Sequence, residues 1–184
     1  MTKTSLPPEK QPAGKVFSTG SGQQVLEAVF HQIGDRFTHQ VILHDGAQTH
    51  TLFTALEGSA DETWPPSPPL QQLSIETRGA SQVALLVGMA GKSHFSASVE
   101  SVPGECRLEF DVAARVQTDP LQIGSTYVAP NLDTTPSCEL LAPDTDSQVI
   151  WENRGENRVV LVKPVLTKTA PLTLRWRYRI QVAL

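Results

Sequence analysis

The C-terminal segment of the chain alternates between apolar and polar side chains at almost every step. Its apolar positions are Leu172, Leu174, Trp176, Tyr178, Ile180, Val182 and Leu184, and its polar positions include Arg175, Arg177 and Arg179. Successive side chains of a β-strand point to opposite faces of a sheet, so this period of two predicts one long strand that is buried on one side only. The interior of the protein is therefore expected to be built from sheet faces.

Other segments carry the same signal. Alternation recurs over residues 108–116, 95–99 and 73–77, and short apolar runs at 83–87, 149–151 and 159–162 are typical of fully buried strands. Residues 39–44 and 49–56 flank Asp45-Gly46, a dipeptide that favours a two-residue hairpin turn. Turn-punctuated strands of this kind, about ten in all, predict an all-β fold, an antiparallel two-sheet sandwich of jelly-roll type.

Residues 23–33 leave two interpretations open. Val25, Val29 and Ile33 repeat at a helical spacing, whereas the β-branched and aromatic content of the segment favours a strand. We favour the strand and keep the helix as the alternative.

The N-terminal segment, residues 1–22, is rich in Pro, Gly, Ser and Thr, and by itself it buries too little apolar surface to fold. We expect an N-terminal arm or flexible tail over residues 1–22 and a single sandwich domain over residues 23–184, since a chain of 184 residues suits one domain.

Charge and composition exclude several functional classes. The net charge of −4 argues against a nucleic-acid binder, which would carry a basic excess. The chain has no apolar run long enough to cross a bilayer, so we expect no membrane partner. The N-terminus lacks the apolar stretch of a secretory signal, so we expect a cytoplasmic protein in which Cys106 and Cys138 are reduced, although a disulfide between them stays possible.

No motif for a cofactor, a metal or a catalytic triad is complete. Residues 88–93, Gly-Met-Ala-Gly-Lys-Ser, lack the spacing of a phosphate-binding loop and run into a strand rather than a helix. Four of the five histidines fall between His31 and His50, but His39 and His44 have opposite parity and would point to opposite faces. Ser93 adjoins His94 without a nucleophile elbow. We therefore predict no cofactor, no metal and no assigned catalytic residue.

Two further features have a structural and a functional interpretation. Arg175, Arg177 and Arg179 share one face, and we favour their neutralisation by Glu109, Asp111 or Glu152 over a site for an anionic ligand. The segment Trp64-Pro65-Pro66-Ser67-Pro68-Pro69-Leu70 must be extended. We expect it to cross one end of the sandwich as a strap anchored by Trp64 and Leu70.

Four short motifs resemble motifs of uncharacterised planctomycete-type bacterial proteins. These motifs are Arg36-Phe37-Thr38-His39, Pro65-Pro66-Ser67-Pro68-Pro69-Leu70, Gly88 to Ser96, and Phe110-Asp111-Val112-Ala113-Ala114-Arg115. The resemblance covers the middle of the chain and implies no fold, substrate or catalytic residue. It directs the search for a site to the polar positions near the middle strands.

The sequence favours a non-catalytic binding or assembly domain that recognises a protein partner or a carbohydrate through loops or a sheet face. The candidate ligand-binding residues are Arg36, His39, Trp64, His94 and Arg115, which offer the cationic, imidazole and indole groups of polar recognition. One alternative is a hydrolase with His94 or His39 as general base. A second alternative is a structural protein that self-associates through a strand edge.

Overall fold

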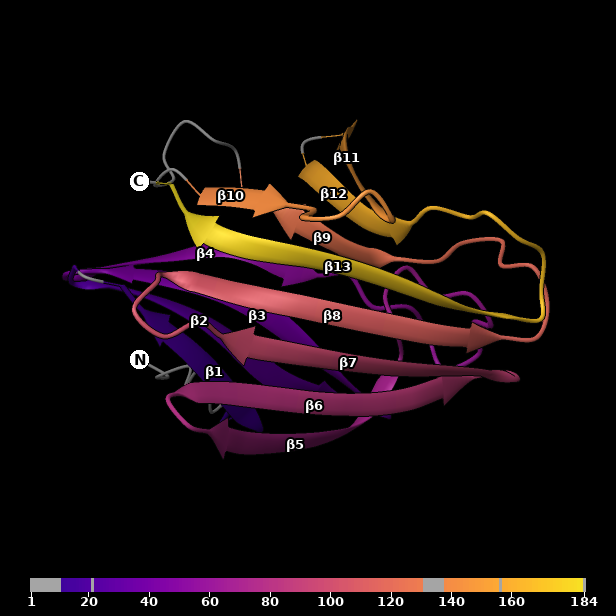
Figure 1. The fold of residues 1–184 in the computed structure, drawn as a ribbon, viewed down its shortest axis with the longest axis horizontal. Coiled ribbons are helices and arrows are strands. Elements are labelled where there is room, and N and C mark those ends of the chain that lie inside the picture. The colour runs from indigo at the N-terminus through magenta and orange to yellow at the C-terminus, as the bar shows by residue number, and fades with distance from the viewer. Residues whose placement is uncertain (1–10, 21, 131–137, 156, 184) are drawn as a thin grey trace, which may run out of the picture.

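The structure is a computed structural model that describes residues 11–20, 22–130, 138–155 and 157–183. Over these residues the chain forms thirteen strands and no helix, in two antiparallel sheets that pack face to face (Figure 1). The predicted all-β, two-sheet sandwich is thereby confirmed. Since the described residues form no helix, none of them belongs to a helix that could span a bilayer.

The two sheets contain seven and six strands. The first has the order β1-β2-β3-β4-β9-β12-β11, with β1 (Gly14–Thr19), β2 (Gln24–Ile33), β3 (Arg36–Asp45), β4 (Gln48–Ala55), β9 (Ser125–Ala129), β12 (Asn157–Pro164) and β11 (Ser147–Arg154). The second has the order β10-β13-β8-β7-β6-β5, with β10 (Cys138–Leu141), β13 (Leu172–Val182), β8 (Arg107–Val116), β7 (Ser93–Ser101), β6 (Ser81–Ala90) and β5 (Leu70–Arg78).

Strand β13 shows how the alternating pattern becomes a core. Trp176, Tyr178 and Ile180 are fully buried between the sheets, whereas Arg175 and Arg177 on the other side are exposed. The Tyr178 ring stacks on Phe110 of β8, with 4.7 Å between ring centroids. Burial of each large side chain of this kind stabilises the fold by about 2–3 kcal/mol, so the inward column fixes which face of the second sheet reaches solvent.

Segment 23–33 is a strand, β2, so its helical alternative is wrong. The structure also adds three strands that the alternation does not reveal, namely β1, β9 and β10, and each has six residues or fewer. Strand β1 lies within the segment expected to be an arm, where it pairs with β2. The hairpin turn lies one residue later than the predicted Asp45-Gly46 turn. Asp45 is still in the strand, where it pairs with Gln48, and the turn begins at Gly46, which adopts a φ of 59°.

The proline strap lies against the end of the sandwich as expected. Trp64 is half-buried against the core and Leu70 is buried. Between them, the Ser67 hydroxyl donates to the Thr126 carbonyl at 3.2 Å and accepts from the Thr126 amide at 3.0 Å. The strap is thus hydrogen-bonded to β9 through the Ser67 side chain, and its exit leads the chain directly into β5.

Gly88 of β6 lets the end of the strap approach the second sheet. A Cβ atom at this position would overlap the carbonyl oxygen of Pro69 and lie 2.9 Å from the Gln71 amide nitrogen. Both are backbone atoms that cannot rotate away.

We expect Gly88→Ala to lower the free energy of unfolding by about 2 kcal/mol, because overpacking of a rigid contact strains the backbone. Chemical denaturation followed by tryptophan fluorescence measures the change. Ser96→Ala, on the exposed face of the neighbouring strand β7, is the control and should stay within about 0.5 kcal/mol of wild type. Equal stability of the Gly88 variant and wild type would contradict the close packing of the strap.

Candidate functional site

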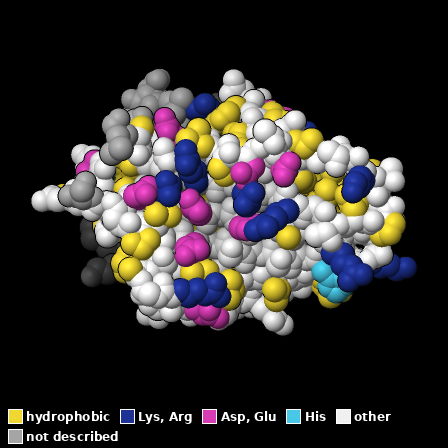
Figure 2. All heavy atoms as spheres, viewed as in Figure 1, with side chains coloured by type: hydrophobic (Ala, Val, Ile, Leu, Met, Phe, Trp, Pro, Cys, Tyr) yellow, Lys and Arg dark blue, Asp and Glu magenta, His cyan; other side chains and the backbone are white. Residues whose placement is uncertain are grey.

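A groove of about 470 Å³ lies on the outer face of the six-stranded sheet, at the end where β6 turns into β7. Its volume falls within the range of about 300–1,000 Å³ that is typical of ligand sites. Residues of β5, β6, β7, β8 and β13 line it, so the sheet itself forms the floor. Figure 2 shows this face, with a histidine beside Lys and Arg side chains at the right-hand end.

His94 and Arg115 are direct cross-strand neighbours in the groove. The register of β7 and β8 sets their Cα positions opposite one another, and Met89 on β6 and Thr173 on β13 continue the same row. His94 and Arg115 are both exposed. Directly opposed residues on one sheet face have Cβ atoms about 4.5–5.5 Å apart, so one ligand group can contact both side chains.

A β-bulge supplies another polar group to the groove. The register of β5 and β6 shifts between Leu70 and Gln72, so Gln71 is the extra residue. Its side-chain carbonyl accepts a hydrogen bond from the Met89 amide at 3.1 Å. A bulge re-aims the side chain that it inserts, and here it turns Gln71 towards the groove and the neighbouring β2–β3 turn.

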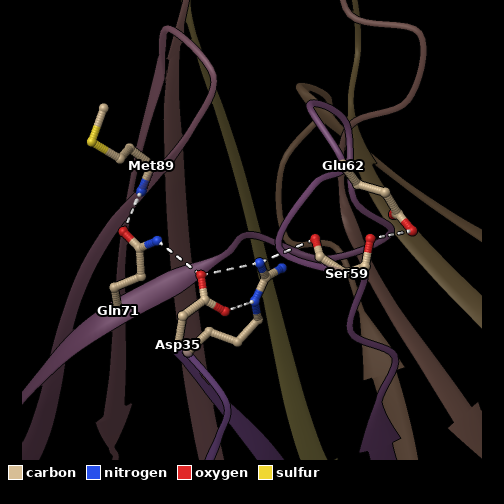
Figure 3. Close-up of polar contacts among 6 residues, drawn as sticks. Asp35, Ser59, Glu62, Gln71 and Met89 are labelled. Carbon is tan, nitrogen blue, oxygen red and sulfur yellow. Dashed lines mark hydrogen bonds and ion pairs between the residues drawn. The ribbon is translucent and has the colours of Figure 1, made fainter.

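Arg36 supports this wall through Asp35, whose contact with Gln71 is drawn in Figure 3. Its side chain is only 4% exposed, and its Nε donates to Asp35 at 2.9 Å while one terminal nitrogen donates to the Ser59 carbonyl at 3.1 Å. Asp35 in turn accepts from the Gln71 amide at 3.4 Å. The hydrogen bond from Arg36 holds the pKa of the Asp35 carboxyl below its usual range. Arg36 is thus a positioning residue behind the groove and does not line it.

The cations of this face divide into two groups. Arg175 pairs with Asp111, as expected, whereas Arg177 pairs with the loop residue Asp144, which is not among the predicted acids. The third member of the stripe, Arg179, forms no ion pair with a described residue, so its predicted neutralisation is not seen. Arg115 and Lys92 form no ion pair with any described residue. In Figure 2 the visible Asp and Glu side chains lie over the middle and the left-hand part of the face, away from the histidine at the right-hand end. The groove is therefore locally cationic on a chain of net charge −4.

His39 lies apart from the groove, on the inner side of the seven-stranded sheet. Its ring stacks on Phe110 at 5.8 Å between centroids, and its Nε2 lies 2.9 Å from the Tyr127 hydroxyl. The Tyr127 hydroxyl also bonds to that of Tyr178. Burial lowers the pKa of His39 to about 4, so the imidazole is neutral near pH 7. This arrangement makes His39 a member of a hydrogen-bonded aromatic core.

Glu57 and Arg36, the latter one of the five ligand-binding candidates, form a second buried polar feature. Glu57 Oε2 and Arg36 Nη1 are both buried without a hydrogen-bond partner among the described residues. Burial raises the pKa of Glu57 to about 7, although Thr38 and Arg36 partly oppose the shift. A carboxyl of this kind is protonated over a wider range of pH in the folded chain than in the unfolded one.

Two other surfaces contain polar or aromatic groups that could contact a ligand. On the outer face of the seven-stranded sheet, Glu27 pairs with Lys15 at 2.9 Å and with His44 at 3.0 Å. At the β10 and β11 edges, an apolar recess of about 270 Å³ contains Trp151, whose ring is covered by the Arg158 guanidinium at 3.9 Å. Among the described residues no group of three His, Cys, Asp or Glu side chains could hold a metal ion.

The structure therefore brings together two of the five candidate residues, His94 and Arg115. Arg36 lies behind the groove, His39 lies in the core, and Trp64 anchors the strap. Gln71 and Thr173, which complete the groove, have no sequence signal of their own because their positions depend on a bulge and on long-range strand pairing.

Cys106 and Cys138 are both thiols, which supports the reduced alternative, and burial raises the pKa of each.

Comparison with known proteins yields no relative. Family models, curated proteins and solved structures all give no match to this chain. The groove must therefore be interpreted from its own chemistry.

Glu57 and His39 predict opposing pH effects on stability. The folded pKa of Glu57, about 7, lies above its ordinary value of 4.5, so this group stabilises the fold below pH 4.5 and loses that contribution as pH rises to about 7. The folded pKa of His39, about 4, lies below its ordinary value of 6.5, so its contribution is lost as pH falls from 6.5 to 4.

We expect Glu57→Gln to remove the first effect and leave the second. Relative to wild type, the variant should gain about 2 kcal/mol of stability between acidic and neutral pH, a value reduced from the full pKa shift because Glu57 is only half-buried. Urea denaturation at a series of pH values measures the slope. The double variant with His39→Asn should show a flatter profile than Glu57→Gln. If Glu57→Gln reproduces the wild-type profile, the pKa of Glu57 is ordinary and the account of its burial is wrong.

Proposed function

We propose that this chain is a non-catalytic binding domain that recognises a protein partner or a carbohydrate through the groove of His94 and Arg115. The observation that carries the proposal is the juxtaposition of these two exposed side chains across the β7–β8 register, in a groove of ligand size. A rigid sheet presents them, so a bound ligand orders few protein groups and binding costs less conformational entropy.

The groups that line the groove suit recognition. Gln71 and Gln72 offer amides, Ser96 and Thr173 offer hydroxyls, and Arg115 offers a guanidinium. Each can hydrogen-bond to a polar ligand without a change of charge. The hydrogen bonds of Gln71 to Met89 and Asp35 hold one wall in place before a ligand arrives.

The proposal predicts where ligands bind. In ¹H–¹⁵N NMR titrations against a panel of short peptides and a panel of oligosaccharides, binding probes should shift amides of residues 87–96 and 113–115. Arg115→Gln should weaken binding about tenfold, the expected loss for a charge-assisted hydrogen bond. Arg177→Gln is the matched control, because it removes an arginine of the same face that is outside the groove, and affinity should hold.

Two results would contradict this assignment of the binding site. Saturable shifts confined to another surface, such as the Trp151 recess, or unchanged affinity of the Arg115 variant, would show that this groove is not the binding site.

A further inference from the structure

The charge of the groove narrows the class of ligand. Arg115 is exposed and has no acidic partner among the described residues, and Lys92 lies in the adjoining turn with none either. None of the described residues that line the groove is acidic. Asp35, the carboxylate that holds Gln71 in the supporting wall, is already paired with Arg36. An anionic ligand group would thus meet uncompensated positive charge, and a planar guanidinium binds a carboxylate through two hydrogen bonds.

Apolar side chains adjoin this charge. Val87 and Met89 are 47% and 46% exposed on the outer side of β6, in the two rows that contain Ser96 and His94. A flexible thioether beside an exposed valine suits an aliphatic side chain of variable shape. Met89 thus lies in the same cross-strand row as His94 and Arg115, and Val87 lies one row away, so an aliphatic site directly adjoins the carboxylate site.

The same lining disfavours sugar rings. The groove has one Phe, Tyr or Trp side chain among its described lining residues, Phe95, and it is buried at 5% exposure and faces the core. The exposed ring of this lining is the small imidazole of His94, so the large apolar ring on which sugars stack is missing from it. An extended peptide needs no such platform. Its backbone can bond to the amides of Gln71 and Gln72 and to the hydroxyls of Ser96 and Thr173.

From this combination we infer that the ligand is an extended acidic segment of a protein partner. An Asp or Glu side chain of that segment lies on Arg115 and His94, and a neighbouring aliphatic side chain packs on Val87 and Met89. The inference rests on the proposed function. It selects the peptide from the two ligand classes named there by charge complementarity and because the described lining has no exposed Phe, Tyr or Trp ring.

The test uses a randomised phage-displayed heptapeptide library. The library is selected on the full chain after depletion on Arg115→Gln, an exposed substitution whose fold is checked by its thermal unfolding. Selected peptides should share an Asp or Glu next to an aliphatic residue. Replacement of that carboxylate by the matching amide in a synthetic peptide should weaken binding about tenfold, as for a lost charge-assisted contact. Arg177→Gln should bind the acidic peptide as wild type does.

The possible outcomes distinguish failure of the acidic-peptide inference from failure of the proposed binding function. If no peptide is enriched, or if enriched peptides lack a carboxylate or bind Arg115→Gln equally, the acidic-peptide inference is overturned. Short oligogalacturonate and its neutral counterpart form a second arm. Binding of oligogalacturonate in the absence of any enriched peptide would overturn the inference while the groove keeps its function. Failure of both arms would overturn the proposed function as well.

Discussion

The register between β8 and β13 is the constraint on which the rest of this structure depends. It stacks Tyr178 on Phe110, buries Trp176 beside Val112, and leaves Arg175 and Arg177 to pair with acids outside. A slip of one residue would exchange the two faces of the strand and place guanidinium groups in an apolar interior, at a cost that no pairing there could offset. The long aromatic column therefore fixes the position of the second sheet, and with it the direction in which every outer residue points.

The groove is a consequence of the same register carried one strand further. Once β8 is fixed by its inner residues, Arg115 must lie on the outer face, and the β7–β8 pairing sets His94 opposite it. The bulge at Gln71, which follows the strap, then forms a wall on one side, supported by buried Arg36 through Asp35. The site thus combines a floor determined by strand alternation with a wall determined by loop packing, and the two have separate physical origins.

Much of this architecture can be predicted from the sequence, and the exceptions have identifiable causes. Strongly alternating segments such as residues 108–116 give their strands directly, whereas β9 and β10 are too short for a period to emerge. The exposure of His94 and Arg115 can be predicted from the alternation of inward and outward side chains along β7 and β8. Parity also places His39 with Val41 and Leu43 on the inner face, a signal that could have separated it from the ligand-binding candidates. The role of Gln71 needs a bulge and a contact between distant strands, and no local pattern encodes either.

The most direct test of the account is a measurement of side-chain proximity at the groove by NOE spectroscopy. Strand parity predicts cross-peaks from the imidazole protons of His94 to the Arg115 side chain and to the Met89 methyl group, because all three lie in one outer row. It predicts none from His94 to the rings of Phe110 and Tyr178, which lie on the opposite side of the sheet. Cross-peaks between His94 and those core rings, without any to Arg115, would contradict the register and with it the site.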